Sequence, residues 1–485
     1  AAIAASAVLS VVEPNSTGIG GDCFAIVTMN GKKPISYNGS GIAPEKANAE
    51  FFFNNKFNKI NIDSPHSITI PGAIHAWYSI HNDHGKLEFE QLFCKAIECA
   101  RDGFNITKKV AESWKKNHIK LKKNKNTNKI FLTNGKPYKF NQKFKNIKLA
   151  KSLEKISKKG IKEFYQGEIT IDIVKSLNEI GGLHTLEDFE KQLTIKDSTI
   201  NCKYRDKIIH QCPPNGPGIT VLFMMQMLEK LKIENYKANS IERFHLEAEV
   251  TKIAYQLREK NIADPNFTKI NFNKLLSLEF INESIKKISL DRCCDVGNLN
   301  IPAHPETVYL TVVDKDFNAV SIINSICYAF GSGISSNNSG ILFQNRGTNF
   351  RIEKNHPNCI DSLKRPLHTI IPGMVFHGEK PILSYGVMGG QYQPVGHVHL
   401  LNNIFDYNMD PQEALDFPRA FSFNDNYQLE NEINKNIENG LKKIGHKVNR
   451  INETHGGGQA IILDWKKGLL IGGSDLRKDG FALGY

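Results

Sequence analysis

Few residues in this sequence have both the type and the spacing of a known catalytic or binding motif. The stretch Gly18-Ile19-Gly20-Gly21 could hold an anion with its backbone N–H groups, although such a stretch more often serves only as a tight turn. His397 and His399 alternate along a predicted strand or helix start, and we assign them a structural role. The motifs G-x-S-x-G, H-E-x-x-H, G-x-G-x-x-G and the Walker loop are absent from the sequence, which excludes several common classes of hydrolase and nucleotide-binding protein.

The cysteines predict neither a metal site nor a disulfide framework. There are nine of them, an odd number, and no C-x-x-C pair occurs. Reduced thiols favour a cytoplasmic protein. The periplasm stays an alternative, because the sequence begins at Ala1 without a methionine and a leader could precede it.

Composition and charge narrow the class of protein further. The 485 residues are 40% hydrophobic and 23% charged, as in ordinary folded proteins, and no apolar run reaches the ~18 residues that a membrane span needs. The net charge is +12, and much of the excess lies between Lys108 and Lys129, where Trp114 is the lone aromatic residue. Because arginines and stacking aromatics are scarce there, we expect a solvated lysine-rich face, with no nucleic acid and no membrane span.

The elements that must position any site follow from the hydrophobic periodicity. An apolar helix is predicted over 1–12 and a buried strand over 24–29, followed by a mostly helical stretch from 87 to 290, with a helix start at Thr185. Residues 307–313 and 319–326 form a predicted hairpin around a polar turn. The last third adds strands at 341–343, 381–387 and 460–463 and helices at 411–415 and 435–444, and the whole indicates sheets covered by helices in one layered α/β unit.

Segments spread over nearly the whole sequence resemble the γ-glutamyltransferase (γ-glutamyltranspeptidase) family of N-terminal nucleophile hydrolases. Each segment is short, but their common order along the chain is specific. They are Val11-Val12-Glu13-Pro14, 16–21, 100–104, 163–165, 181–183, Pro213-Pro214, 312–316, 318–320, 330–333, 339–342, 364–367, Gly389-Gly390 and Gly484-Tyr485.

The resemblance implies a four-layer αββα sandwich and a chain that cuts itself between Glu306 and Thr307. Residues 1–306 would form a large, α-rich subunit whose N-terminal part is truncated here, and residues 307–485 a small subunit that begins at the nucleophile. A threonine hydroxyl needs an adjacent base, and the new α-amine of Thr307, with an ordinary pKa of about 7.7 to 8.0, would supply one.

Other catalytic residues also follow from the resemblance. The backbone N–H groups of Gly389 and Gly390 would stabilise the oxyanion of the tetrahedral intermediate. Ser325 stands where the family usually has threonine, and Thr311 lies four residues along the strand from Thr307, on the same face. We assign both hydroxyls to orienting the nucleophile.

The positions that hold the γ-glutamyl group in the family have changed. Ser40 stands in place of the arginine that binds its α-carboxylate, and Asn349 in place of the aspartate that binds its α-amine. His368 and Thr369 replace the paired serines, and Cys327 replaces an asparagine. The substrate-binding set that these residues would form is therefore not a complete γ-glutamyl site.

The same positions resemble the oxamate amidohydrolases, a second branch of the family. Arg346 would then bind the substrate carboxylate with His368 as a further donor; a surface ion pair is the alternative for Arg346. The matching segments are Gly39-Ser40-Gly41, Thr307-Val308, 344–347, 367–369, 388–390 and Gln393-Pro394.

The predicted function is thus an autoprocessing amidohydrolase that cleaves the amide of a small, oxamate-like acid through an acyl-Thr307 intermediate. It would need no metal and no organic cofactor, and its two cleaved subunits would stay associated. The alternatives are a glutathione hydrolase or γ-glutamyltransferase and, in another class, an inactive relative that acts as a binding protein.

Overall fold

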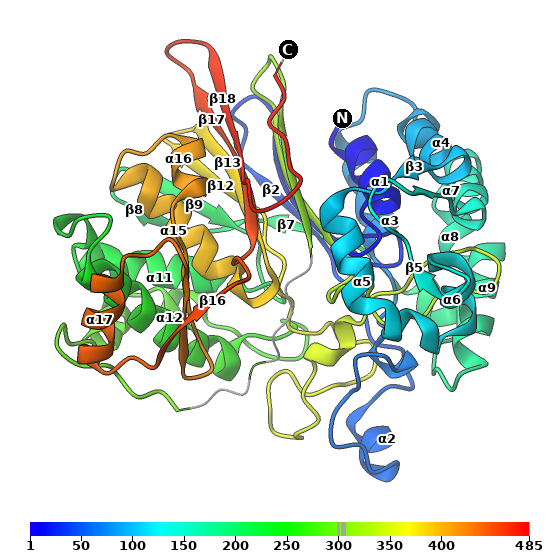
Figure 1. The fold of residues 1–485 in the computed structure, drawn as a ribbon, viewed down its shortest axis with the longest axis horizontal. Helices are drawn as coiled ribbons and strands as arrows, with labels where there is room; N and C mark the ends of the chain where they lie inside the picture. Colours follow the sequence, from blue (N-terminus) through cyan, green and yellow to red (C-terminus); the bar gives the residue numbers. More distant parts are fainter. Residues whose placement is uncertain (298–300, 302–306, 485) are drawn as a thin grey trace.

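The computed structural model describes residues 1–297, 301 and 307–484. Two large β-sheets lie in the middle of the molecule, with helices on either side (Figure 1). The predicted four-layer α/β architecture is confirmed. Glu306 falls outside the described residues, so the structure places Thr307 but not the bond at which cleavage is predicted.

The first sheet has five antiparallel strands in the order β10-β11-β1-β2-β7. The predicted hairpin is confirmed here, since β10 and β11 pair from Val308 opposite Asn324 to Val313 opposite Ala319. The strands are β1 (Asp22–Thr28), β2 (Ile35–Gly39), β7 (Ile195–Ser198), β10 (Val308–Val313) and β11 (Ala319–Ser325).

Strand β1 is buried along its whole length because both of its faces are covered. Cys23, Ala25 and Val27 point into the core beneath one helix layer. Phe24 and Ile26 point the other way, into an apolar layer between the two sheets. The period of two therefore makes one strand contribute to two cores, as a central layer requires.

The second sheet has six antiparallel strands in the order β18-β17-β13-β12-β9-β8. Met374 and Met388 from this sheet meet Tyr309 and Ile323 from the first sheet in the layer between them. The strands are β8 (Ile200–Tyr204), β9 (Lys207–Gln211), β12 (Gly373–His377), β13 (Lys380–Met388), β17 (Gly457–Asp464) and β18 (Leu469–Ser474).

Two helix layers cover the outer faces of the sheets (Figure 1). Beside the first sheet lie α1 (Ala2–Val12), α3 (Ala73–His84), α4 (Cys94–Asp102), α7 (Ile147–Lys159), α8 (Lys162–Tyr165) and α9 (Glu168–Asn178). Beside the second lie α11 (Gly218–Lys230), α12 (Ile241–Asn261), α15 (Gln393–Phe405) and α16 (Pro411–Asp416).

Smaller elements complete the described chain. Helices α5 (Lys108–Lys123) and α6 (Lys125–Phe131) enclose a satellite core around Trp114. Apart from short 3-10 helices, the remaining elements are α2 (Ala49–Asn54), α10 (Leu186–Glu190), α13 (Phe272–Leu275), α14 (Leu278–Ile285), α17 (Lys435–Ile444), β3 (Phe104–Asn105), β4 (Leu132–Thr133), β5 (Lys136–Pro137), β6 (Lys143–Phe144), β14 (Ala420–Phe423), β15 (Asn426–Glu430) and β16 (Val448–Ile451).

One prediction of secondary structure is confirmed in outline and another is wrong. The stretch from 87 to 290 is mostly helical, as predicted, but it also contains β7, β8 and β9, of which β7 and β8 lie at sheet edges. Residues 341–343 form no strand; Leu342 and Phe343 make isolated bridges to Ser335 and Gly20 instead.

Both sheets combine strands from before and after Thr307. In the five-stranded sheet, β10 and β11 pair with β1, and in the six-stranded sheet β12 pairs with β9. The ranges 1–306 and 307–485 are therefore not separate folding units in the described structure. Among the residues that the structure describes, no helix has the length and apolarity of a membrane span.

Candidate active site

Thr307 lies immediately before β10 and is 1% exposed. Its hydroxyl Oγ1 donates to Ser325 Oγ at 3.3 Å and accepts from Gln393 Nε2 at 3.5 Å. Ser325 ends β11, the hairpin partner of β10, and Gln393 begins α15. The hairpin and the start of α15 thus bring two polar side chains to the predicted nucleophile.

Arg346 is buried against the same serine. Its Nη2 donates to Ser325 Oγ at 3.0 Å and its Nη1 to Thr369 Oγ1 at 2.7 Å. The side chain is 0% exposed and its Nε lies 4.0 Å from Asp22 Oδ2, so Arg346 does not form an ion pair on the surface but does lie beside a buried carboxylate. A cation therefore lies one hydroxyl away from Thr307.

Asp22 and His368 form the other half of this polar cluster. His368 Nε2 lies 3.0 Å from Asp22 Oδ2, and His368 Nδ1 accepts from the N–H of Ile370 at 3.3 Å. Burial lowers the pKa of His368 well below its ordinary value, and the charge of Arg346 acts in the same direction. His368 is therefore a neutral imidazole that donates from Nε2 to the carboxylate.

Burial raises the pKa of Asp22 to about 6, although the charge of Arg346, 4.0 Å away at Nε, and bonds from Gln344 and Gly41 oppose the shift. A buried acid placed opposite Ser325 in the β1–β11 ladder was not predicted. Its signal in the sequence is a lone acid at the start of an otherwise apolar strand.

Replacing Asp22 with asparagine will change how stability depends on pH. The folded-state pKa of about 6 lies above the ordinary 3.8, so folded protein binds this proton more tightly than the unfolded chain. The contribution of Asp22 to the free energy of unfolding is thus full below pH 3.8 and lost as the pH rises to about 6, by at most ~1.4 kcal/mol per pH unit. Denaturant titrations of wild type and Asp22→Asn between pH 4 and 7 measure this; a difference constant with pH contradicts it.

The glycine pair lies where β13 ends and α15 is about to begin. Gly389 and Gly390 have φ values of 124° and 56°, and a Cβ on Gly389 would come within 2.7 Å of Gly456 Cα. Among the backbone hydrogen bonds that the described residues form in turns, loops and caps, none has the N–H of Gly389 or Gly390 as its donor. Gln393, three residues after Gly390, reaches Thr307 with its side chain, so the glycine turn belongs to the same region of the structure as the predicted nucleophile.

Helix α12 braces the turn from outside. Arg258 Nη1 donates to Gln391 Oε1 at 2.7 Å, and the hydroxyl of Tyr255 donates to the Gln391 carbonyl. Gln391, the residue after Gly390, is thereby held by two buried side chains.

Ser40 and Asn349 occupy different depths of the site. Ser40 is 0% exposed, and its hydroxyl accepts from Asn215 Nδ2 at 2.9 Å, behind His368. Asn349 Nδ2 donates to the carbonyl of Leu367 at 3.0 Å, while its buried Oδ1 has no hydrogen-bond partner among the described residues. Asn349 therefore offers an acceptor to a ligand, and Ser40 does not contact the cluster around Thr307 directly.

Thr311 stands apart from the rest. Its hydroxyl bonds to Ser384 Oγ at 2.6 Å and to the carbonyl of Val320 at 3.2 Å. Four residues of strand separate it from Thr307 by roughly 13 Å. These contacts give no support to its assignment as a residue that orients the nucleophile.

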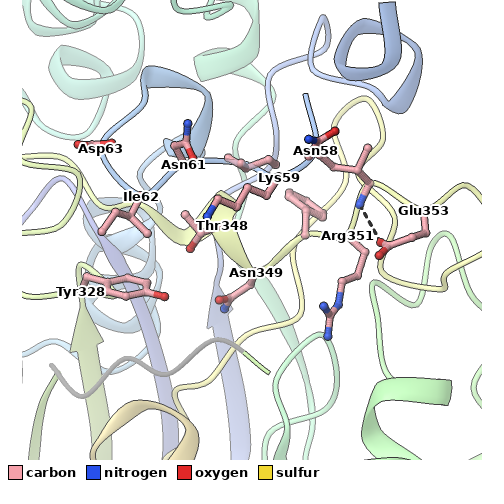
Figure 2. Close-up of a pocket in the computed structure, with 13 residues that line it drawn as sticks. Asn58, Lys59, Asn61, Ile62, Asp63, Tyr328, Thr348, Asn349, Arg351 and Glu353 are labelled. Atoms are coloured by element: carbon pink, nitrogen blue, oxygen red, sulfur yellow. Dashed lines mark hydrogen bonds between the residues drawn. The ribbon is translucent and has the colours of Figure 1, made fainter. Parts of the chain in front are cut away.

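A cavity of about 470 Å³ lies on the solvent side of Asn349. Figure 2 shows Tyr328, Thr348, Asn349 and Arg351 across from the segment 58–63. A small gap bordered by His368, Thr369 and Gln391 shares Asn349 and Arg351 with this cavity. Arg351, paired with Glu259 at 2.8 Å, is a second cation beside the site that sequence reasoning missed.

The two motifs first noted in the sequence have structural roles. A Cβ on Gly20 or Gly21 would lie 2.2 Å from the Leu342 carbonyl or 2.3 Å from that of Ser325, so these glycines allow close backbone packing. His397 is buried, and its Nε2 accepts from the N–H of Val387 at 3.2 Å. Neither motif contributes a side chain to the cluster around Thr307.

Known proteins match this sequence over its whole length. The family model described as Gamma-glutamyltranspeptidase matches residues 1–485. The glutathione hydrolase-like YwrD proenzyme of Bacillus subtilis (strain 168) is 32% identical over 100% of this chain and 93% of its own. The oxamate amidohydrolase proenzyme of Klebsiella pneumoniae is 27% identical over 100% and 93%.

Among solved structures, the cephalosporin acylase from Bacillus halodurans superposes with a TM-score of 0.93. It is 31% identical in sequence, and the match covers 100% of this chain and 91% of that one. The whole of this chain therefore has the same fold as most of that acylase.

Proposed function

Because the chain belongs to the gamma-glutamyltranspeptidase family, it is an amide hydrolase or γ-glutamyl acyltransferase, and within that range we propose an autoprocessing amidohydrolase of small, oxamate-like acids. Thr307 is its nucleophile. Ser325, Arg346, His368, Thr369 and Asn349 form the substrate side of the site, and Gly389 and Gly390 form the oxyanion side.

The observation that carries the substrate class is the position of Arg346. Two successive hydrogen bonds, of 3.0 and 3.3 Å, separate its guanidinium from Thr307 Oγ1. In oxamate the carboxylate is bonded directly to the carbonyl carbon that is attacked, whereas three carbons separate the two groups in a γ-glutamyl amide. A cation this near the nucleophile fits the shorter acid better.

Maturation uses the same hydroxyl as turnover. Thr307 Oγ1 attacks the carbonyl carbon of Glu306, and the C–N bond breaks. The hydroxyl proton passes to the departing nitrogen, which becomes the α-amine of Thr307. Water then hydrolyses the resulting ester, leaving a carboxylate on Glu306 and a free hydroxyl on Thr307. Ser325, 3.3 Å from Oγ1, is placed to orient this hydroxyl in both reactions.

Turnover proceeds through an ester of Thr307. The α-amine takes the proton of Oγ1 as this oxygen attacks the amide carbon, and the N–H groups of Gly389 and Gly390 stabilise the oxyanion. The proton passes to the leaving nitrogen, which departs as ammonia. Water hydrolyses the ester, releasing the dicarboxylic acid and restoring the hydroxyl.

Asn349 supports an amide rather than an α-amino acid as substrate. Its buried Oδ1, without a partner among the described residues, accepts from the NH2 of a primary amide. An aspartate at this place would bring the negative charge that an α-ammonium group needs. The neutral side chain matches an uncharged amide nitrogen.

A glutathione hydrolase is the second candidate, and the cavity of Figure 2 favours it. Its volume of about 470 Å³ accommodates a larger amide, and Arg351 on its wall could bind a carboxylate farther from Thr307. The two candidates therefore differ in which arginine contacts the substrate.

A substrate panel separates these functions. We expect kcat/KM for glutathione to fall below that for oxamate by roughly a hundredfold or more, because two charged contacts worth ~1.5 kcal/mol each are replaced at Ser40 and Asn349. Ammonia and glutamate release are measured separately, with a cephalosporin amide as a third substrate. Glutathione turned over as well as every small amide contradicts the proposal, and binding without turnover of any amide favours the inactive relative.

The two parts that cleavage would create are expected to remain together. The strands of residues 307–484 pair with those of residues 1–297 in both large sheets. The proposed enzyme is therefore a heterodimer of its own two fragments.

A further inference from the structure

A second cluster of reactive side chains lies away from the proposed active site, between α12 and α17. We propose that His245, Glu249, Cys293 and His446 bind one Zn²⁺ ion. Each offers one ligand atom, and these four atoms all lie within 4.8 Å of one another. Ligand atoms bound to one Zn²⁺ lie roughly 3.3 to 3.6 Å apart, so small shifts of these side chains would bring all four onto one ion.

Three separate segments of the chain build this site. His245 and Glu249 are four residues apart on α12 and so share one helix face. His446 follows Gly445, whose φ of 110° ends α17 and turns the chain back. The N–H of Cys293 donates to the carbonyl of Ile444 at 3.3 Å, which ties the cysteine segment to the same turn.

The hydrogen bonds around His245 orient it as a ligand. Its Nε2 lies 2.7 Å from the carbonyl of Ser289, so this nitrogen carries the hydrogen and Nδ1 keeps its lone pair. A ligand histidine held by a backbone carbonyl through its other nitrogen is typical of metal sites. Nδ1 faces Nε2 of His446 at 2.7 Å, and a metal would replace this hydrogen bond by parting the two nitrogens to roughly 3.3 Å.

The charges around the cluster suit a dication. Glu249 is fully buried and accepts from Lys252 Nζ at 2.7 Å and from the N–H of Cys294 at 2.6 Å. Binding of the ion would release the proton of Cys293. The thiolate of Cys293 and the carboxylate of Glu249 would then balance the charges of the ion and of Lys252.

The ligand types point to zinc. Two nitrogens, one sulfur and one oxygen make a four-coordinate set of the kind that Zn²⁺ takes in tetrahedral geometry, whereas Mg²⁺ and Ca²⁺ prefer oxygen ligands alone. With four protein ligands no position is left open for a substrate. The ion would therefore be structural, not catalytic.

The site would also connect the two proposed subunits. His245, Glu249 and Cys293 precede Thr307, and His446 follows it. If cleavage occurs as proposed, the ion joins the end of the first fragment to the second. This consequence rests on the proposed function, whereas metal binding itself does not.

Metal content of the purified full chain tests the proposal directly. After loading with ZnCl2 and dialysis, elemental analysis should find about one zinc per wild-type chain, also in the uncut Thr307→Ala variant. Cys293→Ser and His446→Gln should each lose most of it. The matched control Cys99→Ser, a half-buried cysteine on α4, should retain it.

Two further measurements keep the test independent of folding defects. Chelation of wild type should lower Tm, and zinc should restore it, with no such shift in the Cys293→Ser variant. Co²⁺ in place of zinc should give a thiolate charge-transfer band that Cys293→Ser abolishes. Wild type that holds no more zinc than the double variant Cys293→Ser/His446→Gln overturns the proposal, whether or not the chain cuts itself.

Discussion

Replacing Thr307 with alanine will yield a single uncut chain without measurable turnover. The variant lacks the hydroxyl that attacks the Glu306 carbonyl during maturation and the substrate amide during turnover, and without the cut it has no α-amine to serve as base. Mass spectrometry of the active wild type should find a fragment that begins at Thr307. An active sample that contains only uncut chain contradicts the whole mechanism.

Two variants accompany this experiment as controls. Thr307→Ser keeps a hydroxyl at the same place and should still cut and turn over, although more slowly. Thr311→Val removes a hydroxyl from the same strand, but one that bonds to Ser384 and Val320, so cutting and turnover should continue. Its cost should be a loss of stability of about 1 kcal/mol from the hydrogen bonds. Loss of cutting in Thr311→Val would instead restore the assignment of Thr311 to the nucleophile.

Replacing Arg346 with lysine will lower kcat/KM for the small amide acid by roughly ten- to a hundredfold. Lysine keeps the charge but loses the planar fork that reaches Ser325 and Thr369 simultaneously, and each charge-assisted bond is worth about 1.5 to 3 kcal/mol. Cutting should continue, because attack on the Glu306 carbonyl needs no substrate carboxylate. Steady-state kinetics and a gel of the same sample measure the two effects separately.

The matched control for this prediction is Arg351→Lys, on the wall of the neighbouring cavity. If the substrate carboxylate lies beside Thr307, the Arg351 variant should keep most of its activity on oxamate. A large loss in Arg351→Lys together with normal kinetics in Arg346→Lys would move the carboxylate to the cavity. That result would favour the glutathione hydrolase.

The sequence predicted the fold well where local signals and tertiary environment agree. The helix predicted over 435–444 has the observed bounds, and the helix start predicted at Thr185 is confirmed, where Thr185 forms a capping box with Asp188. The edge strand β7 was missed, since its sequence is polar and largely exposed. Its place depends on pairing with β2, some 160 residues earlier in the chain, which no local pattern reports.

The active site could be predicted only in part for the same reason. Thr307, Gly389 and Gly390 followed from resemblance to a family, not from periodicity or spacing. Asp22 was missed because its role comes from the register of β1 beside β11, which sets it opposite Ser325. The proposed zinc ligands escaped notice because they come from three segments, and only α12 contributes two of them at a recognisable spacing.

Because both sheets combine strands from before and after Thr307, folding before cleavage differs from refolding after it. The uncut chain folds as one molecule. Unfolding of the cut protein separates two polypeptides, each of which lacks strands of both sheets. Refolding then requires the two fragments to associate in a bimolecular step. Refolding yield should then depend on protein concentration for the mature form but not for the Thr307→Ala chain. After maturation, the lifetime of the active enzyme would therefore depend on its rate of unfolding and not on the equilibrium between folded and unfolded chains.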